Sequence, residues 1–165
     1  MKHMRARAVY FCFVLMAFAA AICLAGDSSM DRGTLRGLKA IKVVVDPATT
    51  EMEHEGLDRQ RLQSAIEQKL RDAGIQVDND ANEFLGVTLS SARGSRRGPF
   101  SVAVGLGVYQ TVLLNRDKTI KSVTETWGDQ RVLSTTARTL DHFVSGAVDE
   151  LVDQFIRAYR SVNPQ

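Results

Sequence analysis

Residues 100–127, FSVAVGLGVYQTVLLNRDKTIKSVTETW, decide the fold, because apolar side chains alternate with small ones from Phe100 to Val108 and a polar turn then leads into a second stretch. Period-2 alternation is typical of a strand with one buried face, and NRDK at 115–118 supplies the turn. The first half predicts a long strand over 100–114, and the second half predicts a returning strand over 119–127. DQRVL at 129–133 can extend that strand past Gly128. An antiparallel hairpin is therefore expected.

The remaining elements follow from the same two periodicities and from turn chemistry. Asp58 is a good N-cap for an amphipathic helix over 59–73, and Gly74 supplies its stop. A second helix over 137–160 carries apolar groups over about half its circumference. EMEHEG (51–56) is expected to be a polar loop and RGSRRGP (93–99) a hairpin loop. The other expected strands are LKAIKVVVD (38–46), IQV (75–77) and EFLGVTLSSA (83–92).

The order β-α-β-β-β-β-α predicts an α+β fold, a two-layer sandwich with two helices packed on one face of a mainly antiparallel, four- to five-stranded sheet. Both helices carry an apolar stripe that must be buried against that sheet. The predicted core comprises Val43, Val45, Leu62, Ile66, Leu70, Leu85, Val87, Val102, Val104, Leu106, Phe143, Ala147, Leu151 and Phe155.

Residues 1–25 have the layout of a secretory signal peptide, with three basic residues, then an uncharged apolar run over 8–25, then a polar chain. The best cleavage position lies after Ala25, which predicts a periplasmic or secreted protein. Two alternatives stay open: acylation at Cys23, as in a bacterial lipoprotein, or a retained membrane anchor through residues 8–25. Both cysteines, Cys12 and Cys23, lie in this leader, so cleavage excludes disulfides and thiolate metal sites from the mature chain.

The mature chain is expected to contain a flexible, disordered lead-in over 26–37, one α+β domain over 38–160 and a short tail over 161–165. Three of the 21 basic residues and none of the 19 acidic ones lie in the leader, so the rest of the chain carries 18 against 19, a net charge of −1. Nucleic-acid binding needs a basic excess and is therefore not expected.

The predicted order of elements includes a helix ending LRDAGIQV, a strand ending TW and a final helix VDELVDQFIRAY. In this order the chain resembles small uncharacterised exported envelope proteins of Gram-negative bacteria. It is similar to the lipopolysaccharide-assembly lipoprotein and to the N-terminal domain of TolB. The resemblance covers residues 38–160 and implies a non-enzymatic envelope role. It assigns no functional residue.

Three surfaces are candidates for binding. The hairpin tip gathers like charges, which an anionic head group or acidic partner would match, although a solvated tip explains them too. The outer face of the long strand is nearly free of large side chains, which marks close approach of another backbone or ligand unless the chain itself covers it. The flank of the last helix is an interface if the first helix leaves it exposed. The candidate residues are Arg93, Arg96, Arg97, Gly105, Gly107, Tyr109, Ile156 and Tyr159.

Catalytic chemistry has weaker support. The EMEHE cluster (51–55) could hold a cation, and Glu125 with Asp129 could form an acid/base pair, but each also fits solvated surface charge, as does His142. No cofactor is expected.

Three function classes remain. The first is an exported, non-catalytic interaction or adaptor module that binds an unknown envelope protein or itself. The second is a carrier or sensor of amphiphilic, lipid-like ligands. The third, least supported, is a hydrolase or metal-dependent enzyme.

Overall fold

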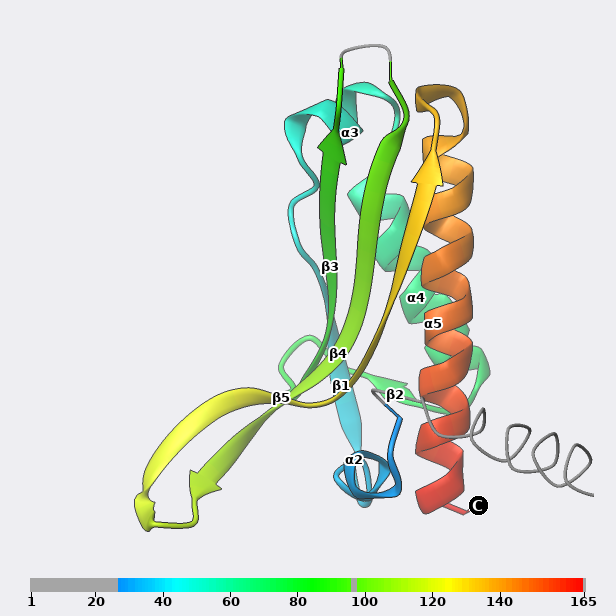
Figure 1. Ribbon diagram of the computed structural model, residues 1–165. Coiled ribbons are helices and arrows are strands. Elements are labelled where there is room, and N and C mark those ends of the chain that lie inside the picture. Colours follow the sequence, from blue (N-terminus) through cyan, green and yellow to red (C-terminus); the bar gives the residue numbers. More distant parts are fainter. Residues whose placement is uncertain (1–26, 96–97, 165) are drawn as a thin grey trace, which may run out of the picture.

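A computed structural model describes residues 27–95 and 98–164 and shows a five-stranded sheet with two long helices on one face (Figure 1). The three leader predictions, which concern Ala25, Cys23 and residues 8–25, lie outside the described residues, as do Arg96 and Arg97. The elements are α2 (Ser29–Gly33), β1 (Ala40–Val45), α3 (Thr50–His54), α4 (Arg59–Asp72), β2 (Gln76–Val77), β3 (Phe84–Arg93), β4 (Phe100–Leu114), β5 (Asp117–Thr135), a 3-10 turn at Ala137–Thr139, and α5 (Leu140–Val162).

The sheet confirms the predicted α+β class, with strand order β2-β1-β3-β4-β5. β1 lies parallel to both β2 and β3, whereas β3, β4 and β5 form an antiparallel meander. β1 and β2 are parallel because α4 lies between them in the chain and returns it to the same end of the sheet. β5 is a single strand of 19 residues and is longer than β4, which has 15.

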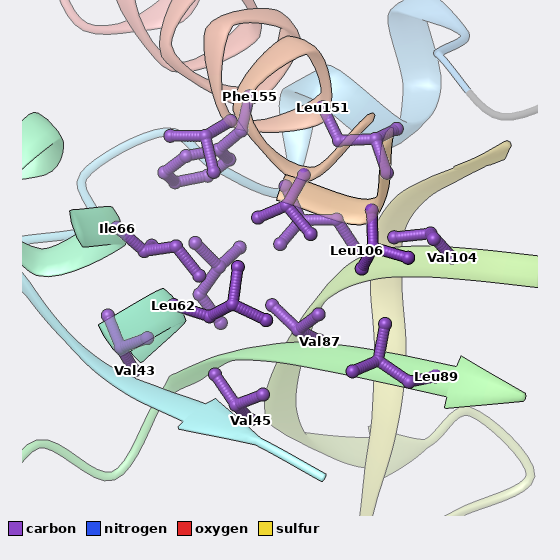
Figure 2. Close-up of a cluster of buried hydrophobic side chains, with 14 of the residues drawn as sticks. Val43, Val45, Leu62, Ile66, Val87, Leu89, Val104, Leu106, Leu151 and Phe155 are labelled. Atoms are coloured by element: carbon purple, nitrogen blue, oxygen red, sulfur yellow. The ribbon is translucent and has the colours of Figure 1, made fainter. Parts of the chain in front are cut away.

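The core lies between the sheet and the two long helices, where side chains from all three point toward one another (Figure 2). Val43, Val87 and Leu106 come from the sheet, Ile66 from α4 and Phe155 from α5, and all are buried. Each large apolar side chain transferred from water in this way contributes about 1.5–3 kcal/mol to folding. No disulfide is needed to explain why the two layers stay together.

The ends of α4 confirm the predicted signals. The Asp58 carboxylate accepts hydrogen bonds from the backbone N–H groups of Gln60 and Arg61, at 2.9 and 3.1 Å. These bonds satisfy two of the donors that a helix leaves free at its first turn. At the other end Gly74 has a φ of 81°, a left-handed conformation that glycine adopts without strain.

Two predicted core residues are placed differently by the structure. Phe143 is 49% exposed, and Ala147 is only partly buried. The buried stripe of α5 runs through Leu140, Val144 and Val148, and Phe143 lies one position, or about 100° of rotation, away from it. The remaining predicted core residues are buried.

The lead-in expected to be disordered is instead packed against the domain. It contains α2, and Leu35 after it is fully buried. Asp27 accepts hydrogen bonds from the Trp127 indole Nε1 at 3.1 Å and from Arg32 Nε at 2.7 Å. The expected tail also takes part, because Asn163 accepts a hydrogen bond from Gly37 N at 2.8 Å. Long-range contacts thus order both ends of the described chain.

The expected polar loop after β1 contains a one-turn helix, α3. Thr49 caps it by accepting a hydrogen bond from Met52 N at 3.4 Å, and the Met52 side chain is completely buried. One anchored apolar side chain and an N-cap thus turn an otherwise charged segment into a helix.

Candidate functional site

A transverse row of glycines crosses the three antiparallel strands. Gly86 of β3 pairs with Gly107 of β4, which in turn pairs with Gly128 of β5. The row lies on the outer face of the sheet, opposite the helices, because Leu106 and Val108 on either side of Gly107 point into the core. Three adjacent strands therefore lack side chains at the same level.

Two side chains lie over this row and explain why it is glycine. A Cβ at Gly107 would come within 2.5 Å of Glu125 Oε2, and a Cβ at Gly128 would also collide with the Glu125 carboxylate. A Cβ at Gly86 would lie 2.9 Å from Tyr109 Cε2. The glycines thus allow Glu125 and Tyr109 to fold back onto the backbone of the sheet.

The two covering residues are bound to each other. The Tyr109 hydroxyl donates a hydrogen bond to Glu125 Oε2 at 3.1 Å, and its ring stacks on Phe84 at a centroid distance of 4.8 Å. Burial raises the pKa of the Tyr109 hydroxyl, and the negative charges of Glu125 and Asp46 raise it further. The tyrosine is therefore a neutral hydroxyl next to a carboxylate.

A β-bulge positions this pair. Val108 pairs with Trp127 and Tyr109 pairs with Glu125, so that Thr126 is the extra residue on β5. The Thr126 carbonyl accepts a hydrogen bond from Thr34 Oγ1 at 3.3 Å. A bulge increases local twist and redirects the strands, and Figure 1 shows β4 and β5 curving away from the body in their shared far half.

The surface around the row forms an open hollow of about 350 Å³. Of its lining residues, Glu125 places a carboxylate on this face, whereas Asp129 pairs with the core residue Leu106 and so points to the helix side of the sheet; no Lys or Arg is among the residues that line it. Asp129 is bound by Arg131 at 2.8 Å, whereas no Lys or Arg of the described chain lies within ion-pair distance of Glu125. We call this surface the glycine hollow: Thr88, Gly105, Leu106, Gly107, Tyr109, Glu125, Gly128, Asp129 and Gln130. It includes the predicted residues Gly105, Gly107 and Tyr109.

Beyond the hollow, β4 and β5 continue as a two-stranded arm, residues 110–124. β3 pairs with β4 only as far as Tyr109, opposite Phe84, so the arm has no third strand. Leu113, Ile120 and Val123 on the arm are 52%, 41% and 60% exposed. The sequence predicted the strands but gave no sign that this half of the hairpin would lie outside the core.

The arm is apolar on both faces and basic near its tip. Leu113 and Val123 continue the outer face that carries Tyr109 and Glu125, whereas Ile120 lies on the opposite face, two residues from Ser122, which pairs with Val112. Residues 110–124 contain one acidic residue, Asp117, and three basic residues, so they carry a net charge of +2. The basic residues are Arg116, Lys118 and Lys121.

Arg93, the described part of the predicted arginine cluster, points back to the domain. Its Nη1 lies 2.8 Å from Glu51 Oε1 and 3.4 Å from Glu55 Oε1, and its guanidinium lies over the Phe100 ring. The Glu51 carboxylate raises the Arg93 pKa, while burial opposes that rise. The charge of Arg93 is therefore matched within the chain, and two carboxylates of EMEHE are its partners.

The predicted flank of α5 is covered. Ile156 is buried, and Tyr159 is half-buried with its hydroxyl donating to the Leu38 carbonyl at 3.0 Å. Neither residue presents the exposed patch for which they were selected, and the Tyr159 hydroxyl is held by the segment between α2 and β1.

The structure places Glu125 and Asp129 on opposite faces of β5, since Asp129 pairs with the core residue Leu106 and Glu125 pairs with Tyr109, and it places the EMEHE cluster far from both. Glu51 is bound by Arg93, which pairs with Phe100 at one end of β4. Glu125 lies on β5 opposite Tyr109, which is nine residues further along β4. At about 3.3 Å per residue this separation is about 30 Å. Among residues 27–95 and 98–164, no three His, Cys, Asp or Glu side chains are grouped closely enough to hold a metal ion. His142 is exposed on α5.

Sequence reasoning missed a second concave surface, a groove of about 570 Å³ between α4 and α5. Its floor includes Leu62, Ile66 and Val152. Ion pairs cross the groove near both ends, from Arg61 to Asp141 and from Lys69 to Asp149. The apolar spacing of each helix was visible in the sequence, but the gap between them depends on how they pack.

Comparisons with known proteins identify no family. No protein-family model matches the chain, and no curated protein matches it. A PelC dodecamer from Paraburkholderia phytofirmans shares 16% identity over 69% of this chain and 85% of that one, with a TM-score of 0.44. A minor lipoprotein from Acinetobacter baumannii shares 16% identity over 74% and 93%, with a TM-score of 0.31. A hypothetical protein from Chlamydia trachomatis shares 9% over 74% and 94%, with a TM-score of 0.32. At TM-scores below 0.5 these likenesses carry no inference about function. No helix in the described part of the chain is long and apolar enough to cross a membrane.

Proposed function

We propose that this protein is an exported, non-catalytic interaction module of the bacterial cell envelope, and that the arm is its docking element. The observation that carries this proposal is the exposure of Leu113, Ile120 and Val123 on a ribbon that has no third strand. Such a ribbon has marginal stability in water on its own. A partner surface would bury these side chains and hold the arm in place.

The leader supports the place of action. The basic start, the apolar run and the small residue at Ala25 direct the chain across the inner membrane. A protein partner in the envelope is therefore the relevant class. The arm would present apolar side chains at the centre of the contact and basic ones at its rim, which is the usual anatomy of a protein interface.

Site-specific photo-crosslinking in cells tests this function. A benzophenone side chain at Val123 should give covalent adducts with an envelope protein, identified by mass spectrometry. The matched control carries the same side chain at Ser64, an exposed residue of α4 on the other side of the molecule. Adducts that are no more abundant at Val123 than at Ser64 would refute the docking role of the arm.

The groove between α4 and α5 supports a second candidate, a carrier of amphiphilic ligands. Its volume of about 570 Å³ falls in the range of small-molecule sites, and its floor is apolar while charged pairs lie at its ends. Lys69 in the groove is paired with Asp149 and Asp153, as Arg93 is with Glu51 and Glu55, so an anionic head group would have to displace carboxylates of the chain at either cation.

Lipid extraction and a blocking substitution test the carrier function. The purified protein should release a lipid that mass spectrometry detects, and Ala65→Trp, which fills the groove, should abolish that signal. Ser64→Trp is the matched control, because Ser64 is the adjacent exposed residue and does not line the groove. Equal lipid content in both variants would exclude the groove as the binding site.

A further inference from the structure

We infer that the arm of one copy docks on the glycine hollow of a second copy, with the basic side chains of the arm placed against Glu125. This inference names the partner of the arm and so rests on the proposed interaction role. It follows from three features of the chain: where its unmatched charges lie, how its apolar side chains are distributed on the arm, and how far the arm extends from its own hollow.

The charges of the arm and of the rest of the protein are complementary. The arm carries +2, and residues 27–109 with 125–165 carry 15 basic and 18 acidic groups, a net charge of −3. None of Arg116, Lys118 and Lys121 forms an ion pair with the described residues, and the same holds for Glu125. Glu125 therefore offers an unmatched negative charge in a cavity, and the arm offers the matching positive charge.

The arm cannot reach its own hollow. Lys121, its basic residue nearest to Glu125 in sequence, lies four residues along the same extended strand, which places the two Cα atoms about 13 Å apart. Lys118 lies seven residues away, or about 23 Å. No ion pair joins Lys121 to Glu125 in this structure, and Lys118 is too far from Glu125 for their side chains to meet along an unbroken β5, so a contact between the tip of the arm and Glu125 is made between two copies.

The apolar pattern of the arm favours a protein surface over a lipid surface. A hairpin that enters a bilayer would carry its apolar residues at the tip, but the tip here is Asn115-Arg116-Asp117-Lys118. A hairpin lying flat on lipid would be apolar on one face, but this arm exposes Val123 on one face and Ile120 on the other. Side chains on both faces are buried when the arm lies between two protein surfaces.

The outer sheet face has the shape and composition to receive it. Glu125 lies over Gly107 and Gly128, and the Thr88 hydroxyl lies over Gly105, so an incoming arm would meet these polar groups on a face without bulky side chains. Val132, which is 75% exposed and pairs with Ala103 on the same face, supplies an apolar contact next to the hollow. The arm and the hollow are different patches on the same face of one copy. Two copies can therefore exchange arms in a closed dimer, or each copy can place its arm on the next one in a head-to-tail chain.

Charge exchange between two variants tests the inference. The full chain is expressed with its own leader, and self-association is measured by sedimentation and light scattering. Wild-type protein should associate, and association should weaken as salt is added. Glu125→Lys, and separately Arg116→Glu/Lys118→Glu, should each weaken self-association at least about tenfold, because like charges then face each other. An equimolar mixture of the two variants should associate again, because each reversed surface meets its complement.

The controls separate this effect from misfolding and from net charge. Arg59→Glu/Arg138→Glu reverses two exposed basic residues outside the arm, on α4 and in the turn after β5, and should associate like wild type. Recovery in the mixture shows that both variants are folded, and near-ultraviolet circular dichroism of Trp127, which lies next to the bulge, reports the same for each alone. A monomeric wild type, unchanged association in the variants, or a mixture of folded variants that stays monomeric would each overturn the inference.

The outcome is distinguishable from failure of the proposed function. Monomeric protein that still crosslinks through Val123 to another envelope protein overturns the second copy as partner and leaves the docking role intact. Self-association lost and regained by charge exchange, with only self-adducts at Val123, supports the inference and removes the adaptor role.

Discussion

Asp27 should hold the start of the described chain to the sheet, and Asp27→Asn is the change that tests this. The carboxylate accepts bonds from Arg32 Nη2 at 2.6 Å, from Arg32 Nε at 2.7 Å and from Trp127 Nε1 at 3.1 Å. The Asp27 side chain is only 11% exposed. An amide can still accept one of these bonds, but it loses the charge and the two-pronged contact with arginine.

The expected cost is about 1–3 kcal/mol, the range for hydrogen bonds to a charged, largely buried group. Against a total stability of about 5–15 kcal/mol for a domain of this size, such a loss is readily measured. Urea unfolding followed by fluorescence is the assay, because Trp127 is the single tryptophan of the chain and one of the three bonds involves its own indole. Asp72→Asn, at an exposed carboxylate on α4, is the control and should change stability by less than about 0.5 kcal/mol.

The pH dependence of the same pair has a definite sign. Burial raises the pKa of Asp27, but the bonds from Arg32 and Trp127 outweigh it, so the pKa in the folded protein lies below the ordinary value of 3.8. A depressed pKa means that the unfolded chain takes up a proton first as the pH falls. The advantage of wild type over Asp27→Asn should therefore be constant above about pH 5 and shrink as the pH falls below 3.8. Equal stability of the two proteins at neutral pH would show that the segment before β1 does not depend on this contact.

Three further predictions concern the leader, the core and the glycine row. Intact mass spectrometry of the exported protein should show a chain cleaved after Ala25, whereas a lipid adduct or a retained leader would contradict soluble export. Phe155→Ala should cost about 3–5 kcal/mol in urea unfolding because that ring is fully buried, and Phe143→Ala should cost less than about 1 kcal/mol; similar losses would contradict the placement of α5. Gly107→Ala should cost about 1–3 kcal/mol because its Cβ would meet the Glu125 carboxylate, and the loss should be smaller in the Glu125→Ala background; additive losses would show that the two residues do not touch.

Elements specified by local periodicity were predicted well, and those specified by distant contacts were not. The apolar spacing of Leu62, Ile66 and Leu70 and the cap at Asp58 are properties of one segment, so α4 could be placed to within a residue. The burial of Leu35 could not be placed in this way, because Asn163 Nδ2 donates to its carbonyl from 128 residues away. A short polar segment looks disordered until the surface that it packs against is known.

The candidate site shows the same division. The small residues of β4 were visible in the sequence, and they predicted a bare outer face that includes Gly105 and Gly107. The register that aligns Gly86, Gly107 and Gly128 was not visible, because it depends on how three strands pair and on the bulge at Thr126. Without that register Glu125 looked like a surface charge, and its position over the glycines could not be inferred.

The arm explains why an alternating pattern alone did not separate core from interface. Val104 and Val112 lie on the same face of the same strand, yet Val104 is fully buried and Val112 is only partly buried. The difference arises at Phe84, where β3 begins and its pairing with β4 ends at Tyr109. Residues of β4 before that point have a third strand beside them and helices above, whereas those beyond it have only β5. The chain thus extends a strand pattern suited to a buried sheet past the end of its own sheet. In the docking that we propose, a second copy covers those apolar side chains, and Lys118 lies against Glu125 of that copy.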